Sequence, residues 1–455
     1  MVRRGLNPAS APPNGFGATL PGGLFLAQVL LGILWFSRPG AHGAPPRINA
    51  EQAAQYFAEA RELGERDRGE LWGHSLLGPI LLVDPITRQV AANLPDREQR
   101  LTKTGEVYVG RLPANVPMAN TAIDWAGVRW TMLTLPLPEN RFRRRILLAH
   151  ELWHRIQEEI GFPSSGVANH HLETRDGRIW LQLEWRALGA ALIEAGRKRK
   201  AAVSDALVFR AYRRSLFQKA AEEERAMEMH EGLAEYTGIA LGGIPNVLRW
   251  VADHNLKEAV AKPTFMRSFA YASGPAYAVL LDRARKEWRK ALKPTDELDA
   301  LLRVSSRLRL PADLAETARS RARNYGGQEL FIAETKREEE REKLLAACRQ
   351  KFIDGPVLVI PLQQLKMEFD PGELIALEPR GTVYPKIKII DLWGTLTVSG
   401  GALLESDFSK VTVSAAVDTR AKPIAGDGWI LELSGDWELK AGLREGDQVI
   451  AKQSQ

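Results

Sequence analysis

The period of the hydrophobic pattern changes near Gly355, and this change limits the fold more than any other feature of the chain. Before it, between Glu139 and Phe352, apolar residues recur mainly every three or four positions, which is the period of amphipathic helices. After it, short runs rich in β-branched residues alternate with turn clusters, the pattern of strands in a sandwich or barrel. We therefore place a domain boundary near Asp354 and predict a β-sandwich-like module over residues 355–455.

A small sheet is predicted ahead of the helices. Three runs with strand character are separated by Gly, Pro and Asn, and a helical pattern over residues 49–68 precedes them. The last run, Val128 to Leu135, is expected to be an edge strand that could hold an extended peptide. The predicted fold class is α+β: a mainly α-helical domain with a small N-terminal sheet over residues 44–354, followed by an all-β module. The three runs are residues 79–83, 106–109 and 128–135.

The first residues have the pattern of an export signal. Two arginines near the start are followed by the apolar run Leu24 to Phe36 and by small residues before Ala44. This order is typical of a secretory signal peptide, here residues 1–43. The apolar run is shorter than the roughly 20 residues that a membrane span needs. We expect an exported protein, periplasmic or secreted, in preference to one anchored by an uncleaved signal.

Charge and cysteine content exclude two kinds of partner or site. The formal net charge of +6 is modest for 455 residues, and basic and acidic runs are interleaved. We interpret the runs 197–200, 222–224 and 338–340 as solvated helix faces and expect no nucleic-acid partner. The one cysteine, Cys348, excludes an internal disulfide and a cysteine-built zinc site, and is expected to be a small buried residue. Any metal must be held by His and carboxylate side chains.

One motif supplies such ligands. Residues 150–154 read His-Glu-Leu-Trp-His, inside a helical pattern from Glu139 to Ile160 that carries one continuous apolar stripe. Two histidines four residues apart project from the same helix face, so their imidazoles can converge on one ion. We interpret His150 and His154 as zinc ligands and Glu151 as the general base. The alternative is that both are ordinary helix histidines without a metal.

A catalytic zinc needs a third protein ligand and one open position. The arrangement that adds Gly and His three and six residues after the second His is excluded, because Gln157 and Ile160 occupy those positions. The other arrangement takes a Glu from a later helix. Residues 230–236, His-Glu-Gly-Leu-Ala-Glu-Tyr, resemble the Glu-Gly-Leu-Ala-Glu-Tyr signature of gluzincin metallopeptidases of the MA clan.

The resemblance implies that Glu231 is the third zinc ligand and that Glu235 braces a ligand histidine. A carboxylate that orients a ligand His is the usual outer partner. The separation of 77 residues between His154 and Glu231 is long for the family, so an insertion around residues 166–219 is expected. Two alternatives stay open: Glu231 and Glu235 could form a solvated helix face, and His230 could be the ligand instead.

The group expected to stabilise the oxyanion is Tyr271. Tyr271 and Gly274 resemble the Tyr-x-x-Gly segment of aminopeptidase-type gluzincins, in which the tyrosine donates to the oxyanion. A core role for Tyr271 is the alternative, and Tyr277 is a second candidate. The Gly-Ala-Met-Glu-Asn segment that holds a free amino terminus in those enzymes is missing, so aminopeptidase activity is not implied.

The resemblance implies a zinc metallopeptidase acting on a peptide or protein, and the signal pattern implies that it is exported. From its place in an exported hydrolase, we expect a substrate-binding or cell-envelope role for the β module. Two rivals remain: a non-catalytic gluzincin-fold module for peptide binding or assembly, and a zinc hydrolase of a non-peptide amide or ester. The sequence does not indicate an oligomeric state.

Three expectations concern side chains outside these motifs. We expect His170 and His171 in a solvated loop and Glu184 in an ion pair with Arg186. Three tryptophans of the β module are expected in its core, in preference to a carbohydrate site. They are Trp393, Trp429 and Trp437.

Overall fold

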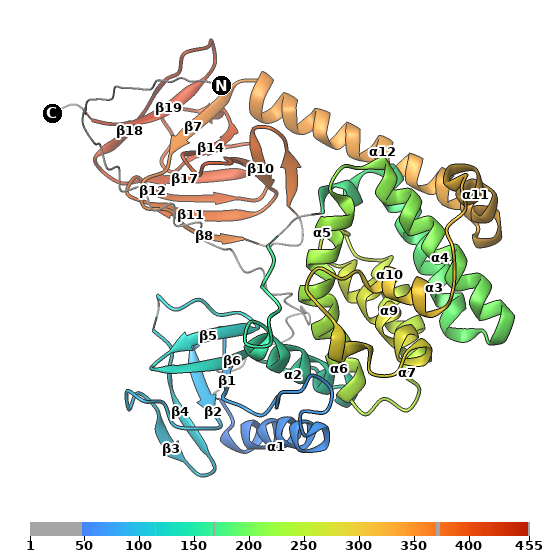
Figure 1. The fold of residues 1–455 in the computed structure, drawn as a ribbon. Helices are drawn as coiled ribbons and strands as arrows, with labels where there is room; N and C mark the ends of the chain where they lie inside the picture. The colour runs from blue at the N-terminus through green and yellow to red at the C-terminus, as the bar shows by residue number, and fades with distance from the viewer. Residues whose placement is uncertain (1–47, 114, 167–168, 370–373, 454–455) are drawn as a thin grey trace, which may run out of the picture. The chain divides into compact units, whose positions relative to one another are not determined.

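The computed structural model describes residues 48–113, 115–166, 169–369 and 374–453 (Figure 1). The predicted signal peptide, residues 1–43, lies outside these residues. Within the described ranges, no helix combines the length and the apolar character needed to cross a membrane. The predicted fold class is confirmed, because helices and a small sheet precede residue 357 and, in the part of the chain that the structure describes, the regular elements after it are all strands.

The N-terminal sheet has six strands in the order β3-β4-β2-β1-β6-β5. β1 and β6 are parallel, and the other neighbours are antiparallel. β6 pairs with strands on both sides, so the prediction that residues 128–135 form an edge strand is wrong. The edge strand next to β6 is β5, whose run of mostly half-exposed residues gives a weak strand signal. The strands are β1 (Ile80–Val83), β2 (Gln89–Ala92), β3 (Thr102–Thr104), β4 (Val107–Arg111), β5 (Thr121–Trp125) and β6 (Val128–Thr134).

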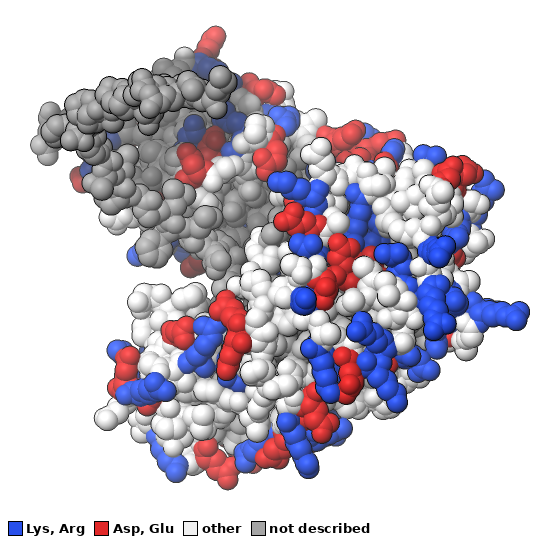
Figure 2. Space-filling model, in the orientation of Figure 1, with Lys and Arg blue, Asp and Glu red and all other residues white. Residues whose placement is uncertain are grey.

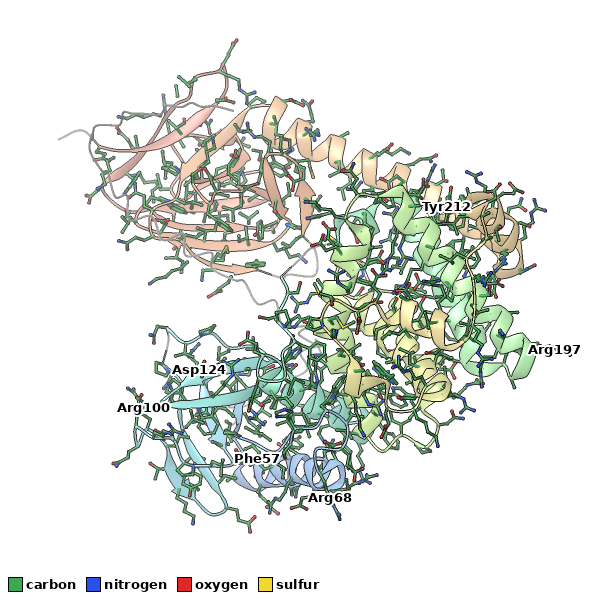
Figure 3. The ribbon with its side chains drawn as sticks, viewed as in Figure 1. Phe57, Arg68, Arg100, Asp124, Arg197 and Tyr212 are labelled. Carbon is green, nitrogen blue, oxygen red and sulfur yellow. The ribbon has the colours of Figure 1, made fainter. Side chains whose placement is uncertain are left out.

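The first helix, α1 (Ala50–Asp67), begins where the side chain of Asn49 accepts hydrogen bonds from two backbone N–H groups. Its apolar stripe is buried, and Phe57, labelled in Figure 3, is one of its core residues. The same core contains Leu133 of β6 and Trp153 of the motif helix. One face of the sheet therefore shares its core with the helices that carry the predicted ligands.

The middle of the chain is helical, as the sequence pattern predicts. Between residues 179 and 238 the helices are separated where Gly196 and Lys219 adopt positive φ angles and where the π-helical turn η2 intervenes. The elements are α2 (Arg141–Ile156), η1 (His170–Glu173), α3 (Arg175–Ile193), α4 (Gly196–Leu216), α5 (Ala220–Met227), η2 (Glu228–Gly232), α6 (Leu233–Leu241), α7 (Val247–Trp250), η3 (Val251–Leu256), α8 (Lys257–Ala259), α9 (Ala270–Ala284), η4 (Trp288–Ala291), α10 (Leu298–Ser305), α11 (Leu314–Ala322), η5 (Arg323–Tyr325), α12 (Gly327–Arg349) and η6 (Gln350–Asp354).

The C-terminal strands form two sheets with a common core. One has seven strands in the order β18-β19-β7-β14-β13-β10-β9, and the other has six in the order β15-β16-β17-β12-β11-β8. Side chains of both sheets meet in that core, as in a β-sandwich. The strands are β7 (Val357–Pro361), β8 (Lys366–Phe369), β9 (Ile375–Leu377), β10 (Gly381–Tyr384), β11 (Ile387–Asp391), β12 (Gly394–Val398), β13 (Ala402–Glu405), β14 (Lys410–Ser414), β15 (Ala416–Asp418), β16 (Ile424–Gly426), β17 (Trp429–Leu433), β18 (Trp437–Ala441) and β19 (Gln448–Lys452).

Several smaller predictions concern burial. The three tryptophans of the module are buried, which confirms their core positions, and Cys348 is buried as expected. Acidic and basic side chains mix over the face drawn in Figure 2, and Arg197 is solvated at the start of α4 (Figure 3). The run 222–224 departs from the prediction, because Glu224 is fully buried.

Candidate metal centre

The histidine motif lies on α2, a helix with a clear start and a buried face. The side chain of Asn140 accepts hydrogen bonds from the backbone N–H groups of Phe142 and Arg143, which caps the helix. α6 packs closely on α2, because Gly238 has no side chain: a Cβ there would lie 2.5 Å from the carbonyl oxygen of Ile146. This approach brings the helix that follows Glu231 next to the helix that carries the histidines.

Three predicted ligands converge. The Nε2 atoms of His150 and His154 are 3.0 Å apart, and they lie 3.4 Å and 3.6 Å from Oε2 of Glu231. Two ligand atoms that are each about 2.1 Å from a tetrahedral ion lie about 3.4 Å apart. The three separations therefore fit a single ion of the size of Zn²⁺, and His150, His154 and Glu231 form a group that could hold a metal.

The outer nitrogen of each histidine is also held. Nδ1 of His150 lies 3.2 Å from Oε2 of Glu235, and Nδ1 of His154 donates to Oε1 of Gln157 over 2.7 Å. Glu235 in turn accepts a hydrogen bond of 3.0 Å from Asn255. A proton on Nδ1 leaves Nε2 with its lone pair free for a metal, and these partners fix the ring orientation. Glu235 thus stands where the resemblance implied, whereas the bracing role of Gln157 was not predicted.

Glu231 lies on the π-helical turn η2 and is buried, so the alternative of a solvated helix face is wrong. Its Oε1 accepts from Arg267 and its Oε2 from the hydroxyl of Tyr271. Burial alone would raise the pKa of Glu231, but the hydrogen bonds from His150 and His154 and the Arg267 charge hold it well below its usual range. An ionised carboxylate is the form that binds a metal.

His230 is not part of the group of three ligands. Its Nδ1 bonds to Gln157, and its Nε2 lies 3.3 Å from Oε1 of Glu231, the oxygen that accepts from Arg267. Burial lowers the pKa of His230 to about 4, so the ring is neutral at pH 7. Its position favours Glu231 over His230 as the third ligand.

Glu151 is buried next to the ligands, and its Oε2 has no hydrogen-bond partner among the described residues. Burial raises the pKa of Glu151, an effect that the charges of His150 and His154 oppose. A carboxylate with a raised pKa and a free oxygen is suited to take up a proton.

Tyr271 belongs to the centre, and Tyr277 does not. The Tyr271 ring stacks on the His150 ring, with 5.5 Å between ring centroids. Tyr277 is buried in the core and donates to Glu184 over 3.1 Å. Tyr271 is thus not a core aromatic, and its hydroxyl lies among the ligands.

Two expectations about side chains outside the motifs are wrong. His171 is not solvated: it is buried, and its Nε2 lies 2.9 Å from Glu224. Glu184 is paired with Arg210 and Arg213 of α4, whereas Arg186 donates to backbone carbonyls. Both errors have the same cause: the partners of His171 and Glu184 are supplied by residues that are far away in the sequence.

Arg267 is the residue of the centre that the sequence analysis missed altogether. It bonds to Glu231 and stands four residues before Tyr271, so a helical spacing from a candidate residue was the one available signal.

Comparisons of the chain with protein-family models, with curated proteins and with solved structures found no match. The chemistry of this centre must therefore be inferred from its own geometry.

Proposed function

We propose that this chain is a zinc metallopeptidase, in which His150, His154 and Glu231 hold the ion and Glu151 is the general base. The convergence of three ligand atoms within 4.8 Å of one another, with Glu151 beside them, is the observation that supports the proposal. Two imidazoles and one carboxylate are a common ligand set of catalytic zinc, and three protein ligands leave a fourth position for water or substrate.

Each residue of the centre has its own proposed role in peptide hydrolysis. When bound, Zn²⁺ supplies a Lewis acid and lowers the pKa of water towards about 7. The free oxygen of Glu151 takes the proton of the attacking water and passes it to the leaving amine. Tyr271 donates its hydroxyl hydrogen to the oxygen of the scissile carbonyl as negative charge develops there. Glu235 and Gln157 keep the two imidazoles aligned.

The substrate is proposed to be a peptide or protein met after export, because residues 1–43 have the composition of a secretory signal.

The test compares the purified chain with the variant Glu151→Gln for zinc content and for cleavage of casein and of a peptide library. The variant should keep one equivalent of zinc and lose roughly 10²–10⁴-fold in rate. Glu159→Gln, an exposed residue beyond the same helix, is the matched control and should behave as the wild type. Wild-type cleavage by Glu151→Gln, or zinc binding without hydrolysis of any peptide, would overturn the proposal. The second result would favour a binding module or a hydrolase of other amides and esters.

A further inference from the structure

The guanidinium of Arg267 brings a permanent positive charge into the candidate metal centre. Arg267 donates to Oε1 of Glu231 and also interacts with Tyr271. Its side chain is 33% exposed, whereas that of Glu231 is 3% exposed. Arg267 therefore reaches from the solvent side into a centre whose ligands are buried.

The backbone of Arg267 is fixed by the turn on which it lies. Oε1 of Glu173 accepts hydrogen bonds from the hydroxyl of Thr264 over 2.7 Å and from the backbone N–H of Phe265 over 2.8 Å. Asn169 donates to the carbonyl of Met266 over 3.1 Å. The ring of Phe265 is fully buried, which anchors the turn further. A charged side chain presented from an anchored turn is pre-organised for binding.

The guanidinium has hydrogen-bonding capacity to spare. Its Nε is buried and has no hydrogen-bond partner among the described residues. A guanidinium has five N–H donors, so one that donates to Glu231 retains donors for a ligand on its exposed side. The carboxylates of the centre, Glu151, Glu231 and Glu235, would repel an anion. Arg267 carries a permanent positive charge and can attract one.

We propose that Arg267 binds the free C-terminal carboxylate of the substrate, so that this centre acts as a carboxypeptidase on the C-terminal end of a peptide. The inference rests on the proposed function. Because Arg267 contacts a metal ligand directly, a carboxylate held by its planar fork lies one or two residues from the reacting carbonyl. Water adds across that peptide bond, which releases a shortened peptide with a new carboxylate and an amino acid or dipeptide with a free amine.

Binding to the inactive variant Glu151→Gln provides the test, measured by calorimetry with zinc bound. Two probes share one sequence and differ at the C-terminus, which is a free acid in one and an amide in the other. The free acid should bind about tenfold tighter or more, because a charge-assisted bidentate pair is lost in the amide. This comparison needs no change at Arg267.

Two further variants in the Glu151→Gln background assign the effect. Arg267→Lys keeps the charge but loses the fork, and Arg267→Met loses both, so the preference for the acid should shrink in the first and vanish in the second. Arg289→Met, whose guanidinium pairs with Asp282 away from the ligands, is the control and should keep the preference. Zinc content is measured for each variant, because Arg267 touches Glu231.

The outcomes separate the two proposals. Equal affinity for acid and amide, with the active chain still cleaving peptides, overturns the role of Arg267 and leaves the peptidase intact. A preference for the acid that survives Arg267→Met in a zinc-loaded protein also overturns it. If the active chain cleaves no peptide, both proposals fail.

Discussion

The molecule contains two clusters of buried charges, and they are built differently. In the arginine network between α3, α4 and α5, Glu184 accepts from Arg210 and Arg213, and Glu224 accepts from Arg213. In the metal centre, by contrast, Oε2 of Glu151 has no hydrogen-bond partner among the described residues. An unpaired arginine nitrogen occurs in both clusters, Nη2 of Arg214 in the network and Nε of Arg267 in the centre. The clusters therefore differ in their carboxylates: those of the network are fully paired with arginines, whereas one carboxylate oxygen of the centre stays free.

The largest effect on stability is expected from breaking the network. Arg213→Met leaves Glu184 and Glu224 buried with fewer partners, and breaking a buried pair costs about 3–5 kcal/mol. Denaturant unfolding should show this loss. Glu151→Gln, an equally buried change in the centre, should leave the unfolding free energy almost unaltered. An equal loss in both variants would contradict the contrast between the clusters.

Acid should act on the same network. Arg213 and Arg214 hold the pKa of Glu224 well below its usual value although burial opposes this, so its folded pKa is depressed. Such a group stabilises the fold above its unfolded pKa of about 4.5, and this contribution is lost as the pH falls through the folded pKa. Unfolding free energies measured from pH 7 to pH 3 should fall most steeply below pH 4.5, and less steeply in Glu224→Gln. If the unfolding free energy depends on pH with the same slope in both proteins, Glu224 does not contribute to the acid sensitivity.

A smaller and different effect is expected at the brace of the centre. Glu235→Ala frees Nδ1 of His150 and should weaken zinc binding about 10- to 100-fold, measured by competition with a chelator. The unfolding free energy of the zinc-free chain should change little, because Glu235 is partly exposed. Zinc affinity equal to that of the wild type would show that the stacked ring of Tyr271 positions His150 without it.

The smallest effect concerns the start of the motif helix. Asn140→Ala removes the cap of α2 and should cost about 1 kcal/mol of stability. Zinc affinity should stay within about twofold, since the ligands lie three turns further along the helix. Stability is measured by denaturant unfolding and zinc affinity by competition with a chelator. A large loss of zinc affinity would mean that the cap also sets the position of His150.

The sequence predicts what depends on short-range periodicity. The apolar stripe of residues 139–160 and the four-residue spacing of His150 and His154 are local, and both identify a buried helix with one ligand face. The positions of Glu231 and Glu235 followed from resemblance to a known signature.

What was missed depends on contacts between distant segments. The order of the N-terminal sheet places β6 inside the sheet, because β6 pairs with the distant strand β1 as well as with its neighbour β5. Glu184 pairs with arginines 26 and 29 residues away, and Arg267 meets Glu231 across 36 residues. Such pairs appear only when the helices are packed together.

The π-helical turn η2 connects the two clusters through one continuous run of backbone. Glu228, at its start, accepts a paired hydrogen bond from Arg210 in the network, and Glu231, three residues later, faces the histidines. A π turn contains one residue more than an α-helical turn would. Deleting a single residue within it would restore α-helical register and rotate Glu231 by about 100° relative to Glu228. The chain would then keep one cluster and lose the other, so deletions across this turn should be tolerated far less than those in nearby loops.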